Sequence, residues 1–109
     1  MPQRKPIRMQ KAVLTDRALI TEFTDLPNVG AATARDLRVL GLTRPQELIG
    51  RDPFEMYAEL CRRTNVRHDP CCIDVFMAVV DFMGGAPARA WWSYTAERKR
   101  RVAASAKSG

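Results

Sequence analysis

The sequence predicts an all-α protein, folded as one compact domain of five to six helices. Apolar residues recur at helical spacing between capping residues and Gly or Pro stops, and no useful stretch shows the apolar–polar alternation of a strand. The chain has 109 residues, of which 46% are hydrophobic and 28% charged. This length and composition allow one modest core but not two, and they indicate a globular chain rather than a disordered one.

The first half of the chain shows three helix signals. A first helix is expected to begin at Thr15 or Asp16 and to continue to Asp25, where a tight turn follows. A second helix is expected over 31–40, because its apolar residues share one face and a glycine follows it. The apolar residues of these two segments are Leu19, Ile20 and Phe23, then Ala34, Leu37 and Leu40. A short third helix is expected from the capping Thr43 to Gly50.

Two Asp-Pro pairs mark the helix starts of the second half. Asp52-Pro53 begins a helix with one apolar and one charged side, and Asp69-Pro70 begins the next. The segment 70–83 is apolar on almost all sides, which predicts the central buried helix. A last helix is expected over 88–100, before a tail rich in basic residues, Ala and Ser.

The positive charge of the chain lies at its two ends. The net charge is +6; residues 1–14 have four basic residues and no acid, and residues 89–109 have six basic residues and one acid. We therefore expect a flexible basic arm over 1–14, a folded domain over 15–98 and a disordered basic tail over 99–109. The ends either attract a nucleic acid or keep the chain soluble, and the second interpretation is preferred.

The stretch from Leu26 to Leu37 predicts a tight hairpin that opens a helix. Gly30 adopts a left-handed backbone or allows a close approach without strain, and Asn28 tolerates the left-handed region. Unpaired N–H groups at the start of the following helix, together with its positive dipole end, favour an anion.

Five residues of this stretch match a known pattern of apolar-Pro-Gly-apolar-Gly followed by a small residue, namely Leu26, Pro27, Val29, Gly30 and Ala34. The stretch therefore resembles the helix-hairpin-helix motif, with Asn28 in place of the first glycine. The resemblance implies that hairpin amides hold a nucleic-acid phosphate without reading sequence. The residues expected to contact the phosphate are Asn28, Val29, Gly30, Ala31, Thr33, Arg35 and Arg38. Ala31 and Ala32 stand where such hairpins often place Lys or Arg, so the hairpin alone is expected to bind weakly.

Matching residues extend over about 16–95. They are Asp25-Leu26-Pro27, Asp36-Leu37, Leu40-Gly41-Leu42, Glu47-Leu48, Arg51-Asp52-Pro53, Tyr57, Leu60-Cys61, Asp69, Cys71 and Trp91-Trp92. In these residues the chain resembles the small bacterial "pathogenicity locus" proteins, some of them labelled mitomycin-resistance proteins. That group is similar to the C-terminal domain of the competence regulator TfoX. The resemblance implies a helix-hairpin-helix fold.

No motif of a known catalytic class is present, so we expect a protein that is not an enzyme and has no cofactor or small-molecule substrate. The preferred function is weak binding of duplex DNA without sequence preference, through its phosphate backbone. The alternative is a module for protein–protein interaction or dimerisation, in which the hairpin only fixes two helices. These two functions differ in their dependence on salt, because phosphate binding releases counterions.

Several residues suggest chemistry but have a structural interpretation. Cys61, His68, Cys71 and Cys72 lack the spacing of a zinc site, so no metal is expected and the thiols are interpreted as buried. Asp74 and Asp81 suggest a catalytic carboxylate pair, but we interpret them as the single solvated stripe of the central helix. Trp91 and Trp92 either stack on bases or pack, one sealing the core and the other its rim, and packing is preferred.

The sequence predicts a cytoplasmic protein. The apolar run 12–14 is too short for a signal peptide, and Asp74 and Asp81 interrupt the most apolar window. Three cysteines, two of them adjacent, do not form a secreted disulfide framework. Because no apolar window is long enough to span a bilayer, we also expect no membrane partner.

Overall fold

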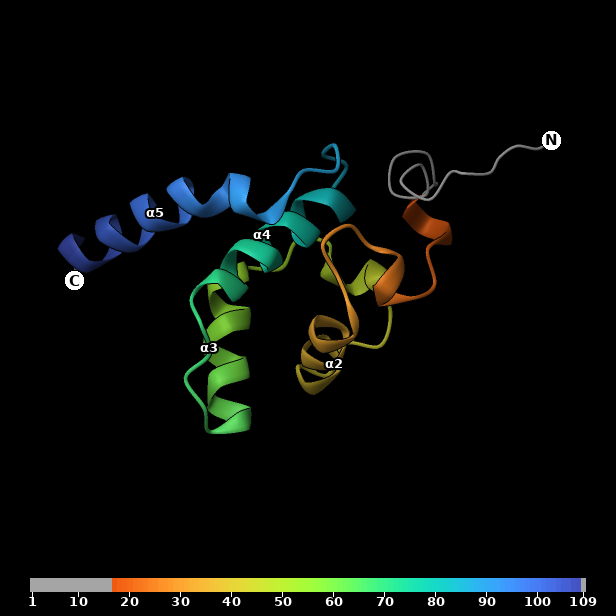
Figure 1. The fold of residues 1–109 in the computed structure, drawn as a ribbon, viewed down its shortest axis with the longest axis horizontal. Coiled ribbons are helices and arrows are strands. Elements are labelled where there is room, and N and C mark those ends of the chain that lie inside the picture. Colours follow the sequence, from red (N-terminus) through yellow and green to blue (C-terminus); the bar gives the residue numbers. More distant parts are fainter. Residues whose placement is uncertain (1–16, 109) are drawn as a thin grey trace.

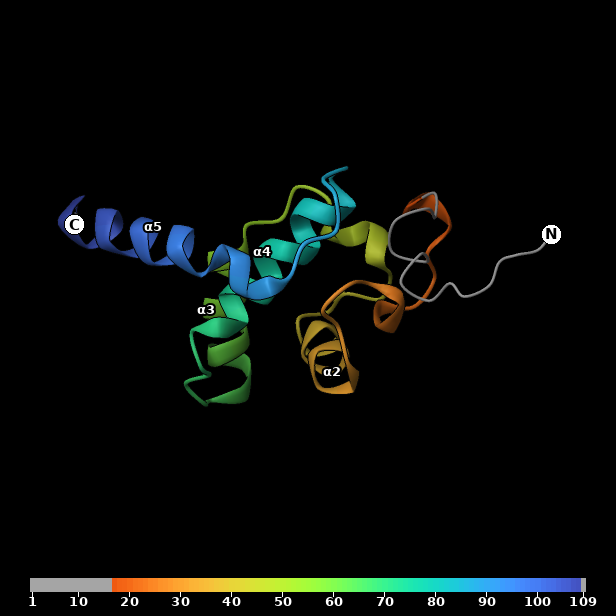
Figure 2. The same ribbon diagram turned by 45° about the horizontal axis from the view of Figure 1, so that its top comes forward.

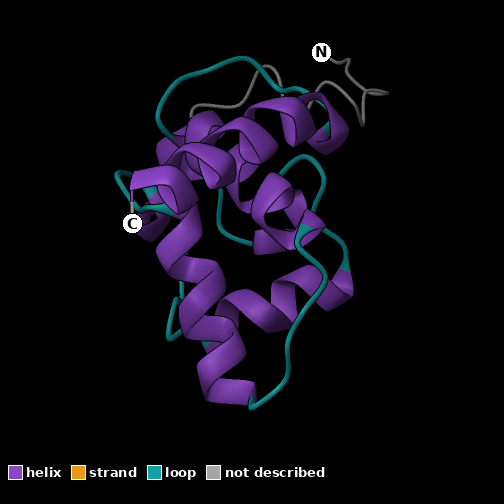
Figure 3. Ribbon diagram, turned by 90° about the vertical axis from the view of Figure 1, so that its left-hand side faces the viewer, coloured by secondary structure: helices purple, strands orange, loops and turns teal. Residues whose placement is uncertain are grey.

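A computed structural model describes residues 17–108, and this part of the chain contains helices and no strand (Figures 1 and 3). The prediction of an all-α fold is confirmed for these residues. The α-helices are α2 (Ala31–Val39), α3 (Pro53–Thr64), α4 (Cys71–Met83) and α5 (Thr95–Ser108). The 3-10 helices are η1 (Arg17–Leu19), η2 (Phe23–Asp25), η3 (Pro45–Leu48) and η4 (Trp91–Tyr94).

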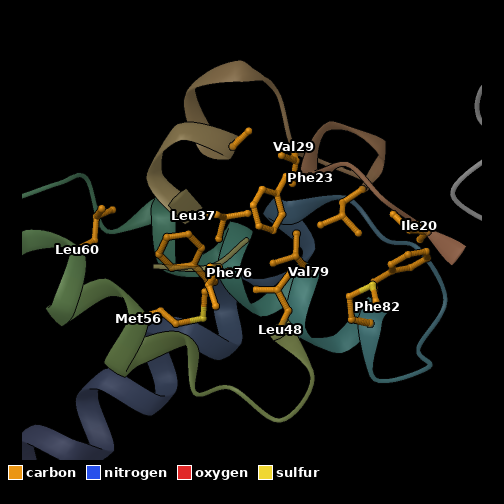
Figure 4. Close-up of a cluster of buried hydrophobic side chains, with 14 residues drawn as sticks. Ile20, Phe23, Val29, Leu37, Leu48, Met56, Leu60, Phe76, Val79 and Phe82 are labelled. Atoms are coloured by element: carbon orange, nitrogen blue, oxygen red, sulfur yellow. The ribbon is translucent and has the colours of Figure 1, made fainter. Parts of the chain in front are cut away.

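Helix α4 lies at the centre of the fold, as its nearly continuous apolar sequence predicts. It contacts α3, α5, η3 and η4, and most of its side chains are buried. Figure 4 shows Phe76 and Val79 of α4 among side chains from α2, α3, η2 and η3. The buried residues of this main cluster are Ile20, Phe23, Leu26, Val29, Ala34, Leu37, Leu42, Leu48, Met56, Leu60, Phe76, Val79, Phe82 and Met83.

The start signal of α3 is confirmed, and α4 begins one residue later than expected, at Cys71 with Pro70 as its N-cap. The Asp52 carboxylate accepts a hydrogen bond from the Phe54 N–H at 2.8 Å, and Pro53 occupies the first helical position. The Asp69 carboxylate accepts one from the Cys71 N–H at 2.9 Å. Both carboxylates satisfy helix N–H groups that have no partner within the helix.

The expected number of five to six helices is wrong for the described residues, which contain four α-helices and short 3-10 turns. The segment around 17–25 is not one helix, because Gln46 Nε2 donates hydrogen bonds to the carbonyls of Arg17, Ala18 and Ile20 at 3.0, 3.3 and 2.7 Å. The expected starts of that helix at Thr15 and Asp16 lie outside the described residues. In the segment 43–50, a proline and a glycine with φ +78° bound a single 3-10 turn.

The turn at 26–30 follows the 3-10 turn η2 and precedes α2, so the helix-hairpin-helix motif is not confirmed in full and stays a prediction. Helix α5 begins at Thr95, later than the expected residue 88, and extends to Ser108. In Figures 1 and 2 it points away from the other helices. Among the described residues, no helix has both the length and the apolar character that crossing a bilayer requires.

The interpretation of Asp74 as a solvated residue is wrong. Its side chain is fully buried and accepts hydrogen bonds from Thr95 Oγ1 at 2.6 Å and from Arg98 Nε at 2.8 Å. These bonds compensate for the loss of water around the carboxylate, and the hydrogen bond with Asp74 raises the pKa of Arg98. Asp74 thereby attaches the first turn of α5 to α4, whereas Asp81 is exposed as expected.

Candidate nucleic-acid interface at the hairpin

The hairpin turns at Asn28, whose φ is +70°, and the Val29 N–H closes the turn on the Leu26 carbonyl at 3.3 Å. Leu26 and Val29 are buried and fix the turn to the core. Figure 4 shows Val29 next to Phe23. Gly30 is extended, with φ −103° and ψ −166°, and a Cβ at this position would meet no atom within 4 Å. The expectation that Gly30 needs a left-handed backbone or a close approach within the chain is therefore wrong.

The Asn28 side chain links the hairpin to the segment before η4. Its Nδ2 donates to the Arg89 carbonyl at 2.7 Å, and its Oδ1 accepts from the Trp91 N–H at 3.2 Å. The side-chain amide of Asn28 is thus used within the fold, and a phosphate would meet the backbone here rather than this side chain. We call this pair of hydrogen bonds the Asn28 clasp.

Helix α2 begins directly after the turn, and its first amides have no partner among the described residues. Gly30, the N-cap, has no side chain to accept from them, and the first helical bond runs from the Ala34 N–H to the Gly30 carbonyl. Within the described part of the chain, the N–H groups of Ala31, Ala32 and Thr33 make no hydrogen bond. Such groups, at the positive end of the helix dipole, attract an anion.

The cations expected to assist are on α2. Arg35 is exposed and has no ion pair with any described residue, and Arg38 is exposed with its Cζ 5.9 Å from the centre of the Phe23 ring. Thr33 is half-buried, and its hydroxyl makes no hydrogen bond within residues 17–108. Asp25 and Asp36 add negative charge to the same part of the sequence, so the local field is mixed.

The two tryptophans lie beside the hairpin, since the Asn28 clasp binds the Trp91 backbone. Trp91 is half-buried and Trp92 is 65% exposed, so the expectation that one of them seals the core is wrong. The aromatic residue of this segment that is buried is Tyr94, which is 2% exposed and packs with Ile73 and Met77 in a second buried cluster. Burial, then a hydrogen bond with Asp81, raises the pKa of Tyr94.

The four consecutive basic residues of α5, Arg98 to Arg101, differ in their partners. Arg98 pairs with buried Asp74, and Arg101 lies 3.6 Å from Glu97 and 4.6 Å from the centre of the Phe54 ring. Lys99 and Arg100 are exposed and have no ion pair with another described residue. The arm 1–14 and the side chains after Ala104 lie outside the described residues.

Cys61 and His68 help to hold the loop that follows α3 against that helix. The Thr64 hydroxyl lies 2.9 Å from His68 Nε2, and the His68 N–H donates to Cys61 Sγ at 3.5 Å. Over residues 17–108, no three His, Cys, Asp or Glu side chains are grouped as metal ligands. The three thiols are free and half-buried rather than fully buried, and burial raises the pKa of Cys72 to about 11.

Comparison with known proteins places the chain in a family. The family model for Cdd1, described as "pathogenicity locus", matches residues 16–100. The mitomycin resistance protein McrB of Streptomyces lavendulae is 43% identical over 83 residues, which cover 76% of this chain and 79% of that protein. No solved structure matches the chain, and the similarity to the TfoX domain stays a prediction. The chain therefore belongs to the pathogenicity locus family.

Proposed function

We propose that this chain is a non-enzymatic protein that binds the phosphate backbone of DNA weakly and without sequence preference. In this proposal the hairpin and the start of α2 act as half of a helix-hairpin-helix motif. The observation that supports it most is the set of amides of Ala31, Ala32 and Thr33, which have no hydrogen-bond partner among the described residues and lie at a helix N-terminus with no capping side chain. Gly30, Ala31 and Ala32 are exposed, and no atom lies within 4 Å of the place where a Cβ on Gly30 would stand, which supports access of a phosphate to this end of α2.

The proposal implies low affinity. Ala31 and Ala32 supply no charge, so the nearest cations on α2 are Arg35 and Arg38. If each neutralises one phosphate, log K falls against log salt with a slope of about −2 from this site. The basic ends of the chain would steepen the slope further.

A cellular role follows from the relative, whose name connects it with mitomycin resistance. We extend this role to the present chain, as part of the same proposal. A strain that lacks the chain is then expected to be more sensitive to mitomycin, and a hairpin variant that has lost DNA binding is expected not to restore resistance.

The sharpest test is Gly30→Asp. The backbone at Gly30 has the β-region geometry of an N-cap, so an Asp carboxylate can accept from the free amides of α2. The variant is therefore expected to be at least as stable as the wild type in thermal unfolding, whereas its carboxylate occupies the site and repels phosphate. Fluorescence anisotropy with a labelled random duplex, at low and physiological salt, is expected to show lost binding. Gly30→Asn is the matched control, since it caps the amides without adding charge and is expected to bind better than Gly30→Asp.

A second pair of variants tests the cations. Arg35→Glu is expected to weaken binding and to flatten the salt dependence, because it removes one phosphate contact. Arg67→Glu makes the same change of charge in the exposed loop between α3 and α4, and it is expected to weaken binding less. Equal losses in both variants would mean that only the net charge matters. Unchanged binding of Gly30→Asp would refute the hairpin as a phosphate site.

The alternative function, protein–protein interaction or self-association, is favoured by a specific feature of α5. This helix points away from the body in Figures 1 and 2. Val102, Ala103 and Ala104 are exposed on it. Sedimentation velocity tests this alternative. Association that persists at high salt and is lost in Val102→Lys, together with absent DNA binding, would replace the first proposal.

A further inference from the structure

We propose that Trp92 is a stacking platform for an unpaired base, so that the preferred ligand is single-stranded DNA rather than duplex. This inference rests on the proposed phosphate site, which it extends to a substrate class. It is carried by the exposed indole, its rigid attachment and its connection to the hairpin.

The indole of Trp92 is 65% exposed, which leaves a large apolar surface in water. It meets Trp91 edge to face, with ring centres 5.7 Å apart and an angle of 84° between the planes. In this geometry one ring supports the other at its edge and leaves a face free. The other exposed large apolar residues belong to different segments, so Trp92 is not part of one continuous apolar helix face. They are Leu19, Ile49, Val66 and Val102.

The backbone that carries Trp92 is held on both sides. On one side the Asn28 clasp fixes the backbone at Arg89 and Trp91. On the other side Tyr94 is buried, and Thr95 donates to Asp74 at 2.6 Å. An indole on a fixed backbone, with a neighbouring ring at 5.7 Å, loses less conformational freedom on binding than one on a free chain, which favours stacking.

The groups connected to Trp92 favour a ligand that has both a negative charge and a planar ring. The Arg89 guanidinium lies 4.6 Å from the centre of the Tyr94 ring and has no ion pair with a described residue. Through Asn28, the same segment adjoins the turn that leads to the free amides of α2. Asp81 is the nearby carboxylate, and it interacts with Tyr94. A nucleotide chain combines phosphates for the amides and the guanidinium with a base for the indole, whereas a duplex hides its base faces.

Intrinsic fluorescence gives a direct test, because the chain has only two tryptophans and both are in this site. Trp91→Phe leaves Trp92 as the only indole. In this variant, oligothymidine is expected to quench the emission of Trp92. An abasic oligomer of the same length has the same phosphates and no bases, so it is expected to bind without quenching.

Affinity measurements complete the test. Trp92→Ala is expected to weaken binding of oligothymidine about tenfold, and to leave binding of the abasic oligomer and of duplex unchanged. Trp92→Phe is expected to restore part of the affinity. Ile49→Ala removes another exposed apolar side chain, 57% exposed, and is expected to change nothing.

The outcomes separate the two proposals. Equal affinity of the wild type for oligothymidine and the abasic oligomer, or an unaffected Trp92→Ala, overturns the platform and leaves the phosphate site standing. Absence of binding to every oligomer overturns both. A change of Trp92 emission with protein concentration alone, without DNA, overturns the platform in favour of self-association.

Discussion

Replacing Asp74 by Asn is expected to lower the free energy of unfolding by about 3 kcal/mol, near the lower end of what breaking a buried ion pair costs. The side chain of Asp74 is fully buried, and that of Arg98 is 15% exposed. Asn keeps the volume and can accept from Thr95, but it removes the charge that compensates Arg98. The slight exposure of Arg98 gives its guanidinium a route to water, so the loss stays below that of a sealed pair.

Urea unfolding followed by circular dichroism measures this loss. With a slope of about 2 kcal/mol per molar urea, the midpoint is expected to fall by about 1.5 M. Glu97→Gln is the control, because it breaks an exposed ion pair. In that pair the side chain of Glu97 is 47% exposed and that of Arg101 is 48% exposed. That change is expected to cost less than about 1 kcal/mol.

A double-mutant cycle identifies the cause. If the buried pair acts as described, Asp74→Asn combined with Arg98→Gln costs clearly less than the sum of the two single changes. Losses that are equal in Asp74→Asn and Glu97→Gln would refute the reasoning, since burial would then make no difference. Additive losses would show that Asp74 and Arg98 do not stabilise each other.

Two further predictions concern protons. Hydrogen bonds lower the folded pKa values of three carboxylates: the Thr43 backbone acts on Glu47, Arg63 on Glu59, and the Cys71 backbone on Asp69. The stability that these three carboxylates contribute is therefore complete above their ordinary pKa values, 4.5 for Glu and 3.8 for Asp, and is lost as the pH falls through the lower folded pKa values. Urea unfolding midpoints measured at a series of acid pH values test this. A Glu47→Gln/Glu59→Gln/Asp69→Asn variant that keeps the wild-type acid dependence would contradict it. Burial is the largest cause that raises the pKa of Cys72 from 9.0 to about 11, and it remains when Cys61 and Cys71 are replaced by Ser. In this background iodoacetamide at pH 8 is expected to label Cys72 at least about tenfold more slowly than in urea, and equal rates would contradict this.

The parts of the fold that depend on local signals were predictable from the sequence. The starts of α3 and α4 follow from Asp-Pro pairs whose carboxylates bind amides two residues ahead. The central position of α4 follows from its apolar sequence. The conformation of the segment 17–25 was not predictable, because three of its carbonyls accept hydrogen bonds from the Gln46 side chain, which is 26 to 29 residues away in sequence.

Of the candidate site, only the course of the backbone was predictable from the sequence. The pattern around Gly30 indicates a turn before a helix, and the structure has both. The roles of Asp74 and Trp92 depend on which side of η4 faces the core. Helical periodicity predicts a buried Trp at 91 or 92, but a 3-10 turn follows there and buries Tyr94 instead. A charge on an apolar helix is ambiguous until its partner, 24 residues further on in Arg98, is known.

Asn28 shows how a departure from a sequence motif acquires a structural meaning. The motif has glycine at this position, and glycine alone would satisfy the left-handed backbone of φ +70°. Asn is one of the few other residues that adopt this region readily, and it adds a donor and an acceptor. The structure uses both, on the Arg89 carbonyl and the Trp91 N–H. The substitution therefore keeps the turn and adds a link between the hairpin and η4, which lie more than sixty residues apart in sequence. The proposed phosphate site and the proposed base platform depend on this one side chain for their relative position.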